Sequence, residues 1–142
     1  MLQRILVPLD GSPLSERALP YARSLARASR ARIILLRAVE AHALTGRGRA
    51  KARVAAMAEA ETYLDAIAGP VREQGLTVDV AVPYGGAADA IADEVALREV
   101  DLVVMATHGR GGVARLVMGS VADKIVRSAR CPVMTLKECP AS

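Results

Sequence analysis

Short apolar runs alternate with segments of helical periodicity along the whole chain. Five runs have the length and the Val, Ile and Leu content of buried strands, and apolar residues recur every three or four positions between them. The runs are Ile5–Val7, Ile33–Leu36, Val78–Val82, Leu102–Met105 and Val133–Leu136. This alternation is typical of β-α-β units, which build parallel sheets covered by helices on both faces. It predicts an open, doubly wound α/β fold with five parallel strands and four helices.

Local signals indicate where three of the helices begin or end. Ser12-Pro13 has the order of an N-cap followed by the first helical residue. Gly69-Pro70 falls inside a long apolar stripe, so a kink or an early end is expected there. Gly119-Ser120 is expected to open the last helix, and Ser120 to Asp123 match a capping box, which needs no ligand.

Length and composition bound the class of protein. A chain of 142 residues suits one domain, over residues 1–142. Hydrophobic residues make up 52% of the chain, yet Phe and Trp are absent, so the core has to be built from Ala, Val, Leu, Ile and Met. The lack of large rings disfavours a surface on which nucleic-acid bases stack. The net charge of +4 is modest and no basic block marks a polyanion-binding arm, so we expect no nucleic-acid partner.

The two cysteines and the N-terminal residues indicate in which cellular compartment the protein is expected. Cys131 and Cys139 make neither a disulfide framework nor a zinc site. The N-terminal residues have no long apolar region of the kind found in signal peptides, and no stretch approaches the length of a membrane span. We expect a cytoplasmic protein with no membrane partner.

Residues that carry chemistry gather after the first and fourth apolar runs. Asp10 follows the first run, a glycine-rich segment from Thr107 to Gly112 follows the fourth, and Gly119-Ser120 comes shortly after. Ligands of open α/β sheets bind beyond the carboxyl ends of the strands, where the strand order reverses. If these two strands are neighbours, both groups face one crevice.

The glycine-rich segment suits a phosphate group. Gly109, Gly111 and Gly112 permit an anion-binding nest of backbone amides, and Gly119 permits close approach to a helix N-terminus. Ser120 supplies a hydroxyl, and Arg110 a charge. The run matches neither the Walker A loop nor the Rossmann fingerprint, and ordinary turn glycines are the alternative.

Other candidate residues are less specific. Asp10 suits a metal ion or a base edge, or it caps a turn. No Ser-His-Asp triad is recognisable and no paired carboxylates converge on the glycines, so no catalytic residue is predicted and no metal ligand is assigned.

At these positions the chain resembles the universal stress protein family, over nearly its whole length. The resemblance begins with Ile5 to Ser12, continues through Asp101 to Gly109, and ends with Gly119-Ser120 and Cys131 to Val133. The family's nucleotide motif reads Gly, two residues, Gly, nine residues, Gly, and Ser or Thr. Gly109 and Gly119-Ser120 match its last part, whereas Ala106 stands in place of the first glycine.

The resemblance implies a flavodoxin-like or Rossmann-like three-layer sandwich with strand order 3-2-1-4-5. It implies an ATP ligand, together with Mg²⁺. The implied contacts are Pro8, Asp10 and Ala38 to adenine; Met105 and Ala106 to ribose; and Gly109, Arg110, Gly119, Ser120 and Val121 to phosphate.

The resemblance also implies a homodimer that pairs the last strand, Val133–Leu136, with its copy. Such pairing would cover an edge strand that carries few charges. The function expected is a nucleotide-dependent stress-response or signalling module with at most slow ATP hydrolysis. The alternative is a dimeric scaffold of the same fold that works without nucleotide.

Overall fold

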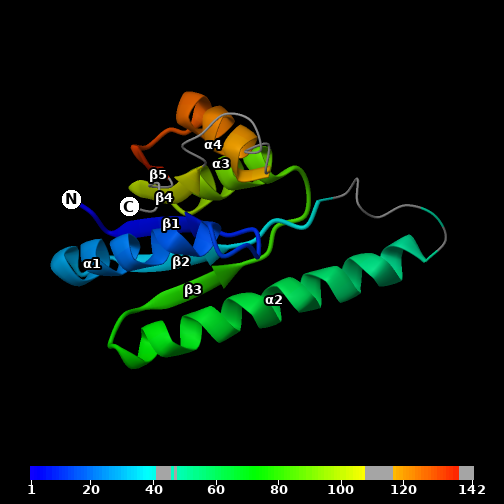
Figure 1. The fold of residues 1–142 in the computed structure, drawn as a ribbon, viewed down its shortest axis with the longest axis horizontal. Coiled ribbons are helices and arrows are strands. Elements are labelled where there is room, and N and C mark those ends of the chain that lie inside the picture. Colours follow the sequence, from blue (N-terminus) through cyan, green and yellow to red (C-terminus); the bar gives the residue numbers. More distant parts are fainter. Residues whose placement is uncertain (41–45, 47, 108–116, 138–142) are drawn as a thin grey trace, which may run out of the picture.

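Five parallel strands form a single sheet in the computed structural model, which describes residues 1–40, 46, 48–107 and 117–137 (Figure 1). The strands are β1 (Arg4–Pro8), β2 (Arg32–Leu36), β3 (Val78–Ala81), β4 (Leu102–Thr107) and β5 (Val133–Lys137). Their order in the sheet is β3-β2-β1-β4-β5, and every neighbouring pair is parallel. The predicted fold class and strand order are confirmed.

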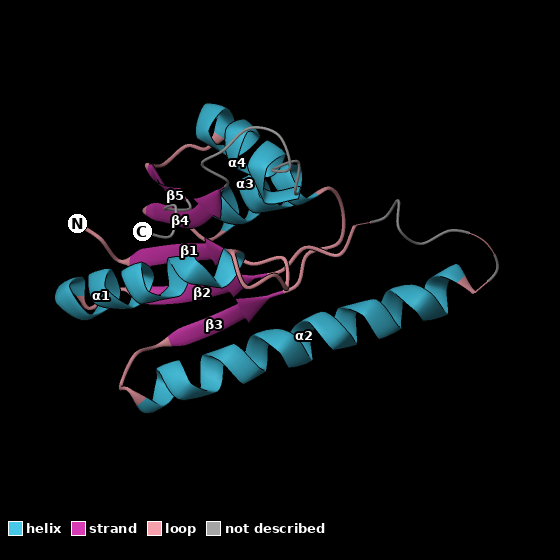
Figure 2. Ribbon diagram, viewed as in Figure 1, coloured by secondary structure: helices cyan, strands magenta, loops and turns pink. Residues whose placement is uncertain are grey.

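Helices cover both faces of this sheet (Figure 2). The helical elements are the 3-10 turn η1 (Ser15–Ala18) and the α-helices α1 (Leu19–Ser29), α2 (Arg49–Glu73), α3 (Ala87–Leu97) and α4 (Val117–Ser128). α1 and α2 pack on one face, and α3 and α4 pack on the other. The described chain is therefore a three-layer sandwich.

Side chains of the central strands alternate between two apolar clusters. Ile5 and Val7 of β1 enter the cluster under α1 and α2, whereas Leu6 enters the cluster under α3 and α4. Because both faces are covered, the strands are apolar at successive positions instead of alternating with polar residues. This explains the continuous runs that the sequence shows.

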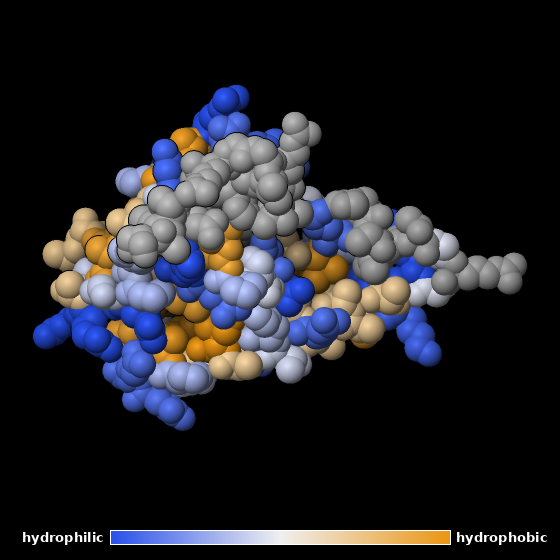
Figure 3. All heavy atoms as spheres, in the orientation of Figure 1, coloured by the Kyte–Doolittle hydropathy of each residue, from blue (hydrophilic) through white to orange (hydrophobic). Residues whose placement is uncertain are grey.

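Small residues let the helices lie close to the sheet without large aromatic rings. α1 presents the fully buried Ala22 and Ala26, and α2 presents Leu64 and Ala68 beside them. In the space-filling view, apolar atoms are visible between α1 and α2, with charged side chains around them (Figure 3). The first turns of α2, residues 49–59, extend beyond the sheet and none of these residues is buried (Figure 1).

The first helix does not begin at Ser12-Pro13 as predicted. Residues 11–14 form a turn, η1 follows at Ser15, and α1 starts at Leu19 with Pro20 in its first turn. The side chain of Ser12 makes a cap-like bond, since its hydroxyl accepts the N–H of Ser15 at 3.2 Å. The N–H of Ser12 itself donates to a carboxylate oxygen of Asp10 at 2.8 Å.

Of the kink or early end expected at Gly69-Pro70, the early end is wrong, because α2 continues to Glu73 with Pro70 inside it. Buried contacts on both sides of the proline, from Ala68 and Val71, hold this turn against the sheet. The side chain of Arg72 donates two hydrogen bonds, of 2.7 and 3.1 Å, to the carbonyl of Val78 and ties the last turn to β3. These contacts offset the hydrogen bond that proline cannot make.

Tyr63 joins α2 to the segment that follows β1. Its hydroxyl donates a hydrogen bond of 2.8 Å to a carboxylate oxygen of Glu16 in η1. Burial, and then the bond to Glu16, raise the pKa of Tyr63 above the usual value for tyrosine. The tyrosine therefore acts as a neutral donor in the folded protein.

We predict that Tyr63→Phe lowers the free energy of unfolding by about 1 kcal/mol at neutral pH, because Glu16 loses a donor. Urea denaturation measures the change, and Tyr21→Phe, at a tyrosine that is 54% exposed, is the matched control. The difference from wild type should shrink as pH rises above about 10, because the unfolded state then releases the tyrosine proton before the folded state does. A difference that grows at alkaline pH would contradict this account.

Candidate functional site

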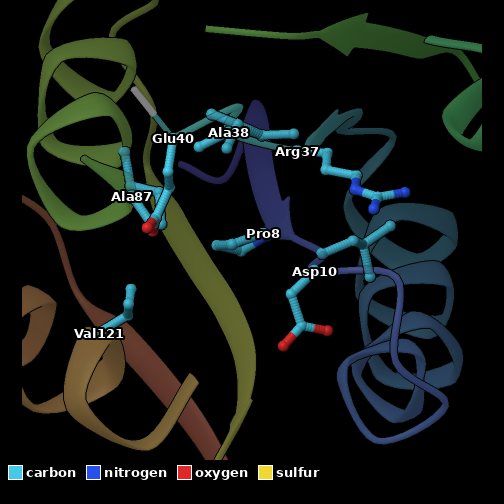
Figure 4. Close-up of a pocket in the computed structure, with 10 residues that line it drawn as sticks. Pro8, Asp10, Arg37, Ala38, Glu40, Ala87 and Val121 are labelled. Carbon is cyan, nitrogen blue, oxygen red and sulfur yellow. The ribbon is translucent and has the colours of Figure 1, made fainter. Parts of the chain in front are cut away.

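A cavity of about 230 Å³ lies beyond the carboxyl ends of β1 and β2 (Figure 4). Its walls come from the segments that leave these two strands and from the sides of α3 and α4. The lining residues are Pro8, Leu9, Asp10, Leu36, Arg37, Ala38, Glu40, Ala87, Ile91 and Val121. The strand order reverses between β1 and β4, so the cavity occupies the position where open α/β sheets bind ligands.

Four of the site residues predicted from sequence meet at this cavity. Pro8 and Asp10 leave β1, Ala38 follows β2, and Val121 reaches the same space from α4 (Figure 4). A hydrogen bond of 2.7 Å from the N–H of Leu9 to the carbonyl of Leu36 holds the two strand exits together. The convergence follows from the parallel pairing of β1 with β2.

The two predicted ribose contacts lie deeper in the sheet. Met105 and Ala106 belong to β4, both are fully buried, and neither lines the cavity. The side chain of Met105 packs in the cluster under α3 and α4. A contact from either residue to a ligand remains a prediction.

The predicted phosphate contacts fall partly outside the described residues. Gly109 and Arg110 are outside the described residues, and so are His108, Gly111 and Gly112. Gly119 and Ser120 lie in the first turn of α4.

The expected start of the last helix at Gly119-Ser120 is wrong by two residues, because α4 begins at Val117. Ser120 is therefore the fourth residue of the helix, in its first turn, and is exposed. The capping box predicted for Ser120 to Asp123 is excluded, since a capping residue has to precede the helix.

Asp10 caps the turn that leaves β1. Its side chain accepts the N–H of Ser12 at 2.8 Å, and its own N–H donates to the hydroxyl of Ser15 at 3.3 Å. Ser15 is fully buried and donates in turn to the carbonyl of Ser12 at 2.9 Å. This set of bonds fixes the backbone that places Asp10 at the cavity. Within the described ranges, no group of three or more His, Cys, Asp or Glu side chains is arranged to hold a metal ion.

Arg37 supports the same turn from the second strand. Its guanidinium lies against Gly11, where an added Cβ would come within 3.1 Å of Nη2. The guanidinium also lies 4.8 Å from the centre of the Tyr63 ring. Figure 4 shows the side chain directed away from Glu40 and Val121. Arg37 therefore contributes its positive charge to the turn and to α2 more than to the cavity.

The lining residues that were not among the sequence candidates are Leu9, Leu36, Arg37, Glu40, Ala87 and Ile91. Glu40 opens the polar stretch of residues 40–49, in which a side chain that faces a cavity is indistinguishable from a solvated one. Ala87 is the first residue of α3, and nothing in its type signals a binding role. The usable signal was position, because residues just beyond the second strand share an edge with Asp10.

We predict that Gly11→Ala destabilises the protein more than Gly75→Ala. Both glycines have φ of +89°, so each substitution places an alanine in the left-handed region of backbone conformation, which costs roughly 1–2 kcal/mol. Only at Gly11 would the new methyl group meet a neighbour, since nothing lies within 4 Å of a Cβ at Gly75. Thermal and urea unfolding measure the two losses, and adding Arg37→Ala should recover part of the loss at Gly11 alone. Equal losses at the two sites would contradict the contact with Arg37.

Comparisons with known proteins point to one family. The family model described as the universal stress protein family matches residues 1–137. A universal stress protein of Thermus aquaticus, from the 3′ region of a QAH/OAS sulfhydrylase, is 32% identical over 96% of this chain and 100% of its own length. The universal stress protein MJ0531 of Methanocaldococcus jannaschii is 25% identical over 97% of this chain and 84% of its own.

Solved structures show the same fold. The structure of MJ0577, obtained to assign its biochemical function, superposes with a TM-score of 0.87 at 21% identity and covers 99% of both chains. A universal stress protein in complex with cAMP has a TM-score of 0.74 at 22% identity, covering 97% of this chain and 98% of its own. An Arabidopsis thaliana family member with AMP bound has a TM-score of 0.71 at 21% identity, and the superposition covers 96% of this chain and 92% of its own.

Proposed function

The chain belongs to the universal stress protein family, and from this we propose that it binds an adenine nucleotide in the cavity beyond β1 and β2. The proposed ligand is ATP with Mg²⁺, and the proposed role is a nucleotide-dependent module of stress response or signalling. The observation that carries the proposal is the meeting of Pro8, Asp10, Ala38 and Val121 around one cavity. Family members in complex with cAMP and with AMP support an adenine ligand.

The size and position of the cavity favour the base end of a nucleotide. Its volume of about 230 Å³ is below the roughly 300–1,000 Å³ of sites that enclose drug-sized ligands. Pro8, Ala38 and Val121 give it apolar walls that suit a purine ring. The phosphates would then extend towards the first turn of α4, whose backbone N–H groups and positive dipole end favour anions. Gly109, Arg110, Gly119, Ser120 and Val121 are the proposed phosphate contacts, and Met105 and Ala106 the proposed ribose contacts.

We predict that Ala87→Leu weakens ATP binding at least tenfold, because the larger side chain enters the cavity. Ala87 lines the cavity at the start of α3, and Leu adds three carbon atoms there. Ala58→Leu, the same change on the exposed part of α2, is the matched control and should leave affinity unchanged. Equilibrium dialysis with labelled ATP and Mg²⁺ measures both, and circular dichroism checks that both variants fold.

The alternative function, a scaffold that works without nucleotide, is favoured by Ala106 in place of the first motif glycine. Its methyl group narrows the space near the expected ribose. The dialysis experiment distinguishes the two functions, since a scaffold would take up no ATP in the wild type and Ala87→Leu would change nothing.

We also propose a cytoplasmic homodimer in which β5 pairs with its copy. β5 is an edge strand, and its residues Val133 to Leu136 are only half-buried in one chain. A strand pair across a two-fold axis would cover this edge. No helix in the described part of the chain has the length and apolar character needed to cross a membrane.

We predict that Thr135→Lys, in the middle of β5, shifts the protein to the monomer in sedimentation velocity, because it would place a charged side chain from each chain in the proposed strand pair. Ser128→Lys, at an exposed position in α4, is the control and should stay dimeric. A wild-type chain that sediments as a monomer at micromolar concentration would contradict the proposed dimer.

A further inference from the structure

A groove of about 570 Å³ lies between the first turns of α2 and the loop that follows β3. The described residues that line it are Arg49, Ala50, Arg53, Val54 and Tyr84. None of these residues lines the cavity beyond β1 and β2, so this α2 groove is a separate hollow. Its lining combines apolar side chains with two arginines, which suits an occupant that is both apolar and anionic.

The stretch of α2 that borders the groove, residues 49–59, extends beyond the sheet (Figure 1). None of its residues is buried, and Val54 is 69% exposed. Helices in proteins are stabilised mainly by the packing of an apolar face, because isolated helices of this length are marginal in water. Within the described part of the chain, this stretch therefore lacks most of the packing that would normally support it.

Three basic side chains, Arg49, Lys51 and Arg53, lie within the first five residues of this stretch. Cations are unfavourable there, because the helix dipole is positive at the N-terminus. The sequence has no acidic residue from 41 to 58, and no ion pair among the described residues involves these three side chains. Outside the described ranges the one acidic side chain is Glu138, which follows β5, at the opposite edge of the sheet from β3. A local sequence that opposes the structure it adopts is typical of functional sites.

Arg53 and Tyr84 are held in place before any partner binds. The guanidinium carbon of Arg53 lies 3.8 Å from the centre of the Tyr84 ring, in a cation–π contact. The backbone of Tyr84 pairs with Val39 in an isolated parallel bridge. Two hydrogen bonds of 2.9 Å flank this bridge, from the N–H of Val39 to the carbonyl of Pro83 and from the N–H of Gly85 to the carbonyl of Val39. A groove whose charged and apolar parts are already ordered loses less conformational entropy on binding.

We infer that the α2 groove docks an acidic amphipathic helix of a partner protein. Its apolar side chains would lie on Val54 and the ring of Tyr84. Its carboxylates would face Arg49 and Arg53, and this charge complementarity would orient it. Residues 49–59 span roughly 16 Å, so a partner helix of about three turns matches their length. The inference does not depend on the proposed nucleotide.

A second copy of this chain and a nucleic acid fit the groove less well. A stable dimer interface buries roughly 800 Å² on each partner, which is more than about three exposed helical turns provide. A nucleic acid offers no apolar side chains for Val54. Its bases would need an uncovered ring to stack on, whereas Arg53 already lies over Tyr84.

Fluorescence polarisation with labelled probes tests the occupant. The main probe is a helix-forming peptide of about eleven residues, with Leu on one face and Glu on the other. One control peptide has Lys in place of every Glu, another has Ser in place of every Leu, and a single-stranded oligonucleotide is the last probe. We expect the acidic amphipathic peptide to bind at least about tenfold more tightly than each of the others, with an affinity that falls as the NaCl concentration rises.

Matched variants test the location. Arg49→Glu should weaken the acidic amphipathic peptide about fivefold, whereas Lys51→Glu, on the opposite face of the same helix and outside the groove lining, should change its affinity much less. Both changes place an acid in the first turn of α2, which favours the helix, so a loss of binding is not a loss of folding. Val54→Ser should weaken the peptide about threefold, and Val126→Ser, at the exposed valine of α4, should not. Circular dichroism checks that all four variants fold.

Each contrary outcome overturns the inference. Equal binding of the acidic peptide with Ser in place of Leu, or equal losses in Arg49→Glu and Lys51→Glu, would show attraction by net charge alone. Tighter binding of the oligonucleotide would make the stretch a nucleic-acid contact. If the wild type binds no peptide, the docking site is absent, and a change of sedimentation in Val54→Ser would then identify a second copy as the occupant.

Discussion

The pairing of β1 with β2 on one side and β4 on the other determines where this chain can bind a ligand. Since all three strands are parallel, their carboxyl ends meet at one edge, and the helices that connect them leave to opposite faces of the sheet. The divergence of those connections opens the space beyond β1. The turn at Asp10, the segment after Leu36 and the side of α4 are brought to that space by the topology. These three segments meet because of the strand order, without an attraction between the segments themselves.

The interior lacks Phe and Trp, and this shapes the cavity as well as the core. Alanines of α1 and α2 let the helices approach the sheet closely, and aliphatic side chains fill the space between. Apolar side chains of the same kind form much of the cavity wall, with Pro8, Ala38 and Val121 among them. A purine held there would meet aliphatic groups and backbone, with no aromatic ring to stack on. Polar contacts must then supply much of the orientation, which is the role proposed for the phosphate segment.

Periodicity predicted the sheet well because burial on both faces leaves a continuous apolar run in the sequence. Helix ends were harder, since they depend on individual hydrogen bonds. A turn and η1 precede α1 after Ser12, and α2 continues through Pro70, where Ala68 and Val71 pack in the core. The resemblance supplied Pro8, Asp10, Ala38 and Val121, which the structure brings together. Glu40 was missed because its residue type does not separate a carboxylate that lines a cavity from a solvated one, and the backbone before it is held by bonds of Val39 to a loop more than forty residues away.

The central claim is that the cavity beyond β1 and β2 holds an adenine nucleotide. The most direct measurement is chromatography, with mass detection, of the small molecules that freshly purified protein releases on denaturation. The account predicts an adenine nucleotide in the released fraction of the wild type, and a reduced amount from Ala87→Leu prepared in parallel. Wild-type protein that releases no nucleotide, and that takes up none when ATP and Mg²⁺ are then supplied, would contradict it.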